Sequence, residues 1–289
     1  MTTEKPFLNE DQIIRHEAFE SWLAHQTLFD DSFFTVFFHN KSVATSMVRT
    51  LLESEEVRLA HSATQVEFRN PGFKTCRFDM LAQTSDGQLV VTEVQKALAE
   101  GPPERWRFYS SILDTRMPLK AGDEYSGLPE TWLFVIFPTD PIGDGQFIYR
   151  FERRERFSHR PMGDRSHIVY INAAKATAET QLGRMVLSMR CDKADDMVYN
   201  EFVDWMRDLK TGNVAKEYEK MLINEFDPMW DGVRDRVEAI GERRATKKEQ
   251  DRIARNMLLR GQPKDFVSQC TSLSAQEVDE IARSLGYGG

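Results

Sequence analysis

The sequence predicts a mixed α/β core followed by an all-helical C-terminal extension. Between Glu56 and Asn172, short apolar segments typical of strands lie among helical segments, and from about Ala174 onward the apolar spacing is helical. The chain has 289 residues, of which 40% are hydrophobic and 11% aromatic. It therefore has enough material for a sizeable core and is not typical of a disordered protein.

The first fifty residues indicate helices. Asp31 and Ser32 are expected to cap a helix over Phe33–Phe38. A further helix follows, with apolar residues at helical period: Val43, Met47, Val48, Leu51 and Leu52.

Three strand candidates come next. Gln65–Arg69 is short and is followed by Asn70-Pro71-Gly72, a turn cluster. Arg77–Thr84 and Leu89–Lys96 flank Ser85-Asp86-Gly87, which is typical of a hairpin connection. The chain thus predicts a β-hairpin in this region.

A helix should begin at Gly101-Pro102-Pro103-Glu104, since proline suits the first turn, and run through Leu113. Thr131–Phe137 is continuously apolar, as in a strand covered on both faces. Gln146–Phe151 and His167–Asn172 are further strand candidates. We therefore expect a core domain over residues 1–190 and a helical extension over residues 191–289.

The charge is uneven along the chain. The formal net charge is −8, but 13 acids against 7 bases lie between Cys191 and Glu238. Six arginines against three acids lie in Tyr149–Arg165, and seven bases against three acids in Gly241–Arg260. The overall sign therefore does not exclude DNA. The Tyr149–Arg165 segment is either a local DNA contact or a solvated face, and the Gly241–Arg260 segment either lies on DNA or pairs with the acidic Cys191–Glu238 segment.

The spacing of the cysteines and the length of the apolar stretches indicate where in the cell the protein acts. Cys76, Cys191 and Cys270 stand far apart, which suits a reducing cytoplasm rather than a disulfide framework or a zinc site. The densest apolar stretch, Trp132–Phe137, is far shorter than the roughly 20 residues of a membrane span. The polar segment MTTEKPFLNEDQ lacks the apolar core of a signal peptide. We expect a cytoplasmic protein with no membrane partner.

Two acids, Asp79 and Glu93, lie in otherwise apolar strand candidates. Burying an unpaired charge costs several kcal/mol, so such residues usually have a partner. One partner is a divalent metal ion, and the other is an arginine such as Arg77 or Arg105. Both readings are open from the residues alone.

The connection between the two strands decides whether the acids meet. With a three-residue loop and Gly87 in the left-handed conformation, Thr84 faces Gln88 and Asp79 faces Glu93. Their Cβ atoms would be about 4.5–5.5 Å apart, within reach of one Mg²⁺. A two-residue turn would instead place Glu93 on the opposite face.

Gln95 should point the same way as Glu93, because strand side chains alternate, and Lys96 should point the other way. Arg105 and Tyr109, at i and i+4 on one helix face, are candidates to hold a phosphate near the acids. Two acids with a polar side chain beside them are typical of a hydrolytic metal site, where the third side chain orients water.

The order of strand, Asp79, hairpin, Glu93-x-Gln95, helix and apolar strand resembles the PD-(D/E)xK nuclease superfamily. More closely it resembles the Rpn branch of recombination-promoting nucleases, also described as transposases. The resemblance covers roughly Asp31–Asn172. Its segments are DSFFTVFF, FDML…GQLVVTEVQ, ERWRFYSSIL, AGDEY and HIVYIN, with the tail LLRGQPKDFVSQCTSLSAQEVDEI beyond them.

The resemblance implies a restriction-endonuclease-like core, in which helices flank a mixed central sheet, and metal-dependent cleavage of DNA. It implies that Asp79 and Glu93 bind Mg²⁺ or Mn²⁺ and that Gln95 stands in place of the usual lysine as the third catalytic residue. Arg105, Tyr109 and Lys96 are then the residues expected to bind substrate.

Two other functions are open. One is a catalytically degenerate nuclease fold that serves as a DNA- or protein-binding module, which the neutral Gln95 favours. The other is an RNase H-like transposase, which needs a third acid for which the sequence offers no persuasive candidate. The C-terminal helices are open between DNA binding, contact with a second copy in a homodimer, and neither.

Overall fold

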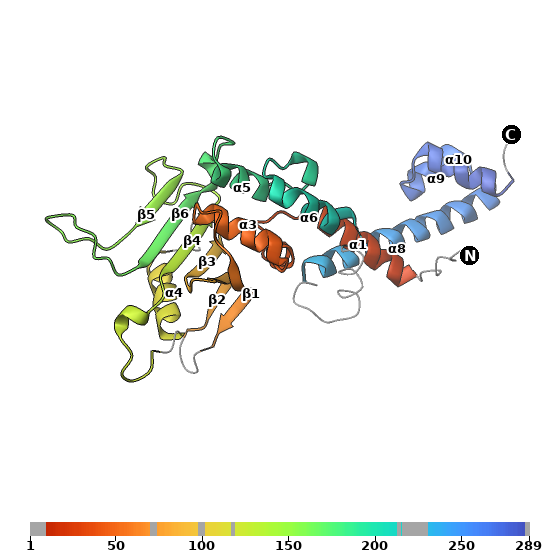
Figure 1. Cartoon of the computed structure of the whole chain (residues 1–289). Coiled ribbons are helices and arrows are strands. Elements are labelled where there is room, and N and C mark those ends of the chain that lie inside the picture. The colour runs from red at the N-terminus through yellow and green to blue at the C-terminus, as the bar shows by residue number, and fades with distance from the viewer. Residues whose placement is uncertain are drawn as a thin grey trace, which may run out of the picture. The chain divides into compact units, whose positions relative to one another are not determined.

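A mixed β-sheet of six strands forms the centre of the fold (Figure 1). The strand order is β1-β2-β3-β4-β6-β5. Strand β2 is antiparallel to both β1 and β3, strands β3, β4 and β6 are parallel, and β5 is antiparallel to β6. The strands are β1 (Leu59–Phe68), β2 (Cys76–Thr84), β3 (Leu89–Val94), β4 (Thr131–Phe137), β5 (Ile148–Phe151) and β6 (Ser166–Asn172).

The computed structural model of the chain describes residues 10–69, 74–97, 102–116, 119–212, 215 and 231–286. They fall into two units, one made of the described residues of Ala24–Tyr218 and the other of those of Met1–Leu23 and Glu219–Gly289. These limits differ from the predicted domains 1–190 and 191–289, which stay a prediction. The predicted Asn70-Pro71-Gly72 turn and Gly101 lie outside the described residues.

The larger unit carries the sheet and most of the helices. The helices are α2 (Asp31–Phe38), α3 (Lys41–Leu51), α4 (Pro103–Arg116), α5 (Gln181–Met189) and α6 (Asn200–Thr211), with short 3₁₀ turns η2 (Tyr125–Gly127), η3 (Ala173–Lys175) and η4 (Ala194–Asp196). One core cluster lies between α4 and the sheet, where Trp106 and Leu113 pack with Val91 and Val135. On α2, Phe37 packs edge-on against Phe202 of α6.

The smaller unit is helical and has its own core. It contains α1 (Glu10–Ala24) up to its last residue, α8 (Asp231–Leu259), α9 (Lys264–Thr271) and α10 (Ala275–Ser284). Its buried apolar cluster comes from α8, α9, α10 and the connection before α10: Ala254, Leu258, Val267, Leu273, Val278, Ile281 and Ala282. Among the described helices, none combines the length and the apolar composition needed to cross a lipid bilayer.

The β2–β3 hairpin has the predicted register. Thr84 N–H donates to the Gln88 carbonyl over 3.0 Å, and Gly87 takes a φ of +94°, so the loop has three residues. The pairs run from Gln83–Leu89 to Met80–Thr92, and in this register Asp79 comes next opposite Glu93. The left-handed φ explains why glycine occupies this position.

Several element bounds differ from the sequence-based expectations: β5 begins at Ile148 rather than Gln146, β3 ends at Val94 rather than Lys96, and β1 and α2 also begin elsewhere. Strand β1 begins at Leu59, earlier than the predicted Gln65. The prediction started late because the first half of the strand (LAHSAT) lacks an alternating apolar pattern. Asp31 is the first residue of α2 rather than its cap, and Asp30 precedes the helix. The Asp30 carboxylate instead accepts hydrogen bonds from Thr27, so it is not available to cap α2.

The pairing register of the parallel strands shows which residues lie at each end of the sheet. Leu89 at the start of β3 pairs with Thr131, which pairs with Ser166 at the start of β6. Glu93 lies further along β3, opposite Val135. Residues 93–96 therefore lie at the end of the sheet where the parallel strands finish.

Candidate active site

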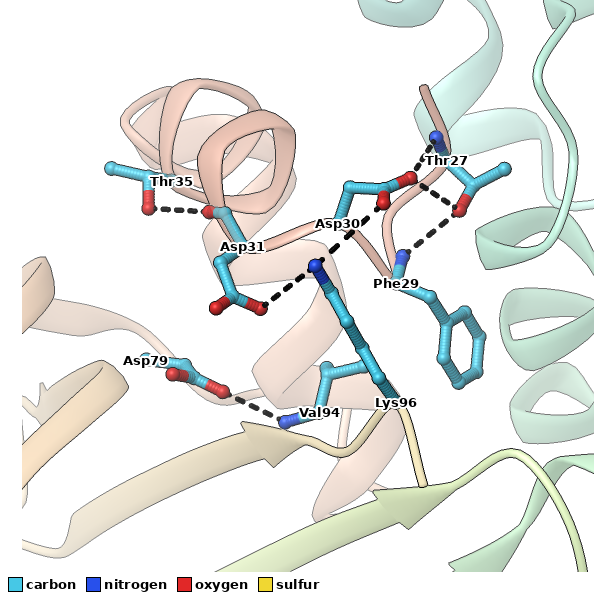
Figure 2. A network of polar contacts seen from close by, with 8 residues as sticks. All are labelled: Thr27, Phe29, Asp30, Asp31, Thr35, Asp79, Val94 and Lys96. Carbon is cyan, nitrogen blue, oxygen red and sulfur yellow. Dashed lines mark hydrogen bonds and ion pairs between the residues drawn. The ribbon is translucent and has the colours of Figure 1, made fainter. Parts of the chain in front are cut away.

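Asp79 and Glu93 meet where the β2–β3 pairing stops. The last regular pair is Met80–Thr92. Beyond it, the carboxylates of Asp79 and Glu93 accept hydrogen bonds from the backbone of the opposite strand. Asp79 N–H donates to Glu93 Oε1 over 3.1 Å, and Val94 N–H donates to Asp79 Oδ2 over 2.9 Å. Figure 2 shows the Asp79–Val94 contact. Each carboxylate is thus positioned by the backbone of the neighbouring strand.

Glu93 is fully buried, with no exposed surface. One of its oxygens, Oε2, has no hydrogen-bond donor among the described residues. The Arg105 Nη2 atom forms an ion pair with that oxygen at 3.7 Å, which is too long for a hydrogen bond. An acceptor buried without a donor is costly, so Glu93 Oε2 indicates a place for a proton or a cation.

The surroundings of the two acids disfavour their ionised forms. Burial raises the pKa of Asp79 to about 6, with Asp31 adding to the effect and the Val94 N–H opposing it. Burial, and then the adjacent charge of Asp79, raise the pKa of Glu93 well above its ordinary value. Arg105 lowers the pKa of both carboxyls but does not offset their burial.

Arg105 on α4 contacts two further predicted site residues, Gln95 and Tyr109. Its Nη1 lies 3.4 Å from Gln95 Oε1, and its Nη2 donates to the Tyr109 hydroxyl over 3.0 Å. The guanidinium also lies over the Trp106 and Tyr109 rings, 4.9 and 5.0 Å from their centroids. Because one guanidinium reaches both Glu93 and Gln95, these two side chains lie on the same side of β3, as predicted.

Lys96 reaches a different set of groups. Its Nζ lies 3.8 Å from Asp30 Oδ1 and 3.9 Å from Asp31 Oδ1, at the start of α2 (Figure 2). Asp30 is held in turn by the Thr27 N–H and hydroxyl. Lys96 therefore points toward α2, whereas Gln95 contacts α4, which agrees with the expected alternation.

These residues line one open cleft of about 370 Å³. The lining contains three acids (Asp31, Glu67 and Asp79), three bases (Arg77, Lys96 and Arg105), and Thr75, Val94, Gln95 and Tyr109. All the predicted site residues line this cleft except the fully buried Glu93. The sequence did not predict three acids as site residues: Asp30, Asp31 and Glu67. Acids at a helix start and in an edge strand carry no sequence signal that links them to Asp79.

A family model for the PD-(D/E)XK nuclease family transposase matches residues 31–257 of the chain. The chain belongs to this family. The match begins at the first residue of α2 and continues into α8, so it extends beyond the segment Asp31–Asn172 that carried the resemblance. The six-stranded mixed sheet with flanking helices is the restriction-endonuclease-like fold expected of the family. Searches of curated proteins and of solved structures found no match.

The residues present suit the divalent cation that a nuclease of this family implies. Asp79 and Glu93 offer carboxylate oxygens, which Mg²⁺ and Mn²⁺ prefer, and Glu93 Oε2 lacks a hydrogen-bond donor among the described residues. The described residues contain no group of three or more His, Cys, Asp or Glu placed to hold a metal ion. A cation would therefore rest on two carboxylates, with water or substrate completing its ligands.

Proposed function

We propose that this chain is a DNA endonuclease that hydrolyses phosphodiester bonds with Mg²⁺ or Mn²⁺, in transposition or recombination. The observation that carries the proposal is the carboxylate pair of Asp79 and Glu93. The two groups come from neighbouring strands, bond each other's strand backbone, and leave Glu93 Oε2 buried without a donor among the described residues. Family membership supports a nuclease over other hydrolases.

In this proposal Asp79 and Glu93 bind the cation. When bound, the cation supplies positive charge to the phosphate and lowers the pKa of water. Gln95 is neutral and its carbonyl oxygen faces Arg105, so it does not act as a base. Its amide nitrogen positions the attacking water instead.

The basic side chains of the cleft would bind the substrate. Arg105, fixed between the Trp106 and Tyr109 rings, offsets charge on the scissile phosphate, and Tyr109 holds the guanidinium in place. The Lys96 side chain is half exposed, and it would contact a flanking phosphate. We further propose that the protein acts in the cytoplasm, and a homodimer stays a prediction.

The test is nicking of supercoiled plasmid DNA by the purified protein with Mg²⁺ or Mn²⁺. Asp79→Asn and Glu93→Gln should each lower the nicking rate by at least about 100-fold, because each removes one charged ligand. Calorimetric titration with Mn²⁺ alone should show binding to the wild type that weakens at least about tenfold in both variants.

The matched control is Asp86→Asn, which removes an exposed carboxylate from the loop at the far end of the same hairpin. This variant should nick DNA and bind Mn²⁺ like the wild type. Nicking that persists in both Asp79→Asn and Glu93→Gln would contradict the assignment of the site.

A binding module without catalysis is the second candidate. The observation that favours it is Arg105, whose guanidinium forms an ion pair with Glu93 and contacts Gln95, as in the arginine-paired reading of the acids. In that case the wild type binds DNA equally well with and without Mn²⁺, nicks none of it, and the two acid variants bind DNA unchanged.

A further inference from the structure

The chain between β5 and β6, residues 152–165, forms a basic arm that projects from the sheet (Figure 1). Its two sides are joined by backbone bonds from Met162 N–H to the Arg153 carbonyl (2.8 Å) and from Glu155 N–H to the Arg160 carbonyl (2.9 Å). An isolated bridge pairs Arg154 with Pro161 between them. The arm is therefore a narrow hairpin that continues beyond the sheet.

The tip of the basic arm is held by its own polar groups. Glu155 Oε2 accepts hydrogen bonds from Phe157 N–H (3.0 Å), Ser158 N–H (2.6 Å) and the Ser158 hydroxyl (2.7 Å). Arg154 Nη1 donates to the His159 carbonyl over 2.8 Å, and His159 takes a φ of +54°. The tip thus has a defined conformation before any partner binds.

This ordered tip presents an aromatic ring and two cations to solvent. Phe157 is 87% exposed. Arg153 pairs with Asp164 and Arg154 with Glu152, whereas Arg156 and Arg160 form no ion pair with any acid that the structure describes. Two unpaired guanidinium groups therefore flank one exposed aromatic side chain.

We propose that the tip of the basic arm is a second DNA contact of this protein. Arg156 and Arg160 bind phosphates, and Phe157 stacks on or wedges between bases. A polyanion with aromatic faces matches this surface in both charge and chemistry, and both contact types are used by proteins that bind nucleic acids. An acidic protein surface would pair with the arginines but would give the ring no stacking partner.

The contact would lie away from the proposed cleavage site. The arm joins the sheet at Ser166, which aligns with Leu89 at the start of β3, whereas Glu93 lies four residues further along. At about 3.3 Å per residue this is roughly 13 Å along the strands, and the arm projects in the other direction. The inference rests on the proposed DNA substrate and assigns the arm to DNA that flanks the cut.

The test is fluorescence anisotropy of a labelled duplex of about three helical turns, in EDTA to prevent cleavage. Phe157→Ala should weaken binding about tenfold without changing the salt dependence, because it removes a stacking contact. Arg156→Ala and Arg160→Ala should each reduce the slope of log K against log salt by about 0.9. The matched control is Arg150→Ala, at a residue in β5 that already pairs with Glu53 and should bind within about twofold of the wild type.

The outcomes separate this inference from the proposed function. If the wild type binds and nicks DNA and the tip variants do so equally well, the arm contact is overturned and the nuclease proposal stands. If the wild type binds no duplex at low salt and nicks no plasmid DNA with Mg²⁺ or Mn²⁺, both fall. If Phe157→Ala changes the mass of the protein in solution but not its DNA binding, the tip is a protein contact and the inference is overturned.

Discussion

At the scale of single residues, Arg105 is the side chain that joins several parts of the candidate site. It contacts Glu93, Gln95 and Tyr109 at once, and two aromatic rings fix its guanidinium. A rigid, always charged group suits both pairing with a buried acid and binding a phosphate. A cation bound by the carboxylates and the Arg105 guanidinium would both be positive charges beside the negative charge of Glu93. The two positive charges would therefore repel each other when the cation binds.

This opposition gives a prediction for Arg105→Gln. The variant should nick DNA at least about tenfold more slowly, because a positive charge near the phosphate is lost. It should bind Mn²⁺ at least as tightly as the wild type, because a cation 3.7 Å from Glu93 Oε2 is removed. Plasmid nicking and Mn²⁺ calorimetry measure the two effects separately.

Arg107→Gln is the matched control, since Arg107 lies on the same helix and is exposed. It should leave Mn²⁺ affinity unchanged. A parallel loss of Mn²⁺ affinity and nicking in Arg105→Gln would mean that Arg105 supports the fold of the site rather than the phosphate.

Part of this site could be predicted from residue patterns. Acids in apolar strands and the arithmetic of a three-residue loop place Asp79 opposite Glu93, and the alternation of β3 sends Gln95 and Lys96 to different sides. The contacts of Lys96 with Asp30 and Asp31 could not be predicted, because they join segments far apart in the sequence. The missing donor at Glu93 Oε2 depends on packing, which no local pattern encodes.

At the scale of elements, a half-buried lysine links α6 to the segment before α2. Lys210 Nζ donates to the Gln26 carbonyl over 2.7 Å and lies 4.7 Å from the centre of the Phe33 ring. Burial lowers the pKa of Lys210 to about 8, while the charges of Asp192 and Asp30 act against the shift. The folded state therefore releases this proton more easily than the unfolded state does.

Between about pH 8 and 10.5 the unfolded chain keeps the Lys210 proton while the folded chain loses it, so stability should rise with pH in this window. Lys210→Met removes the titrating group. When the pH rises from 7.5 to 10, the free energy of unfolding of the wild type should therefore increase by about 1–2 kcal/mol more than that of the variant. Urea denaturation at both pH values measures the difference, and equal changes in the two proteins would refute it.

Elements with strong local patterns were predicted well, and those set by tertiary packing were not. The apolar run Thr131–Phe137 became β4 with the predicted bounds, because a strand buried on both faces is apolar throughout. The first half of β1 was missed, because among the described strands β1 pairs with β2 alone and most of its side chains are half-buried or exposed. An edge strand needs little apolar character and leaves a weak signal.

At the scale of the whole chain, the two units have separate apolar cores. Among the described residues, the cluster around Val278 draws on α8, α9, α10 and their connection, while the cluster around Trp106 draws on α4 and the sheet. Val278→Asp should therefore unfold α9 and α10, since it buries an unpaired charge, and should leave the sheet intact. Hydrogen exchange should rise by orders of magnitude in α9 and α10 and stay unchanged in β3 and β4.

The control for this prediction is Glu280→Gln, an exposed position on the same helix, where exchange should not change. Plasmid nicking by Val278→Asp should remain within about twofold of the wild type if the carboxylate pair acts without the smaller unit. A large loss of nicking with an intact sheet would assign the C-terminal helices a part in DNA cleavage.

The opposite positions of the basic arm and the carboxylate pair along the strands have a consequence for substrate length. If DNA binds both regions as proposed, a fragment that ends just past the cut would contact only one of them, whereas a longer fragment would contact both. Cleavage efficiency should then increase abruptly at a threshold length of the DNA fragment.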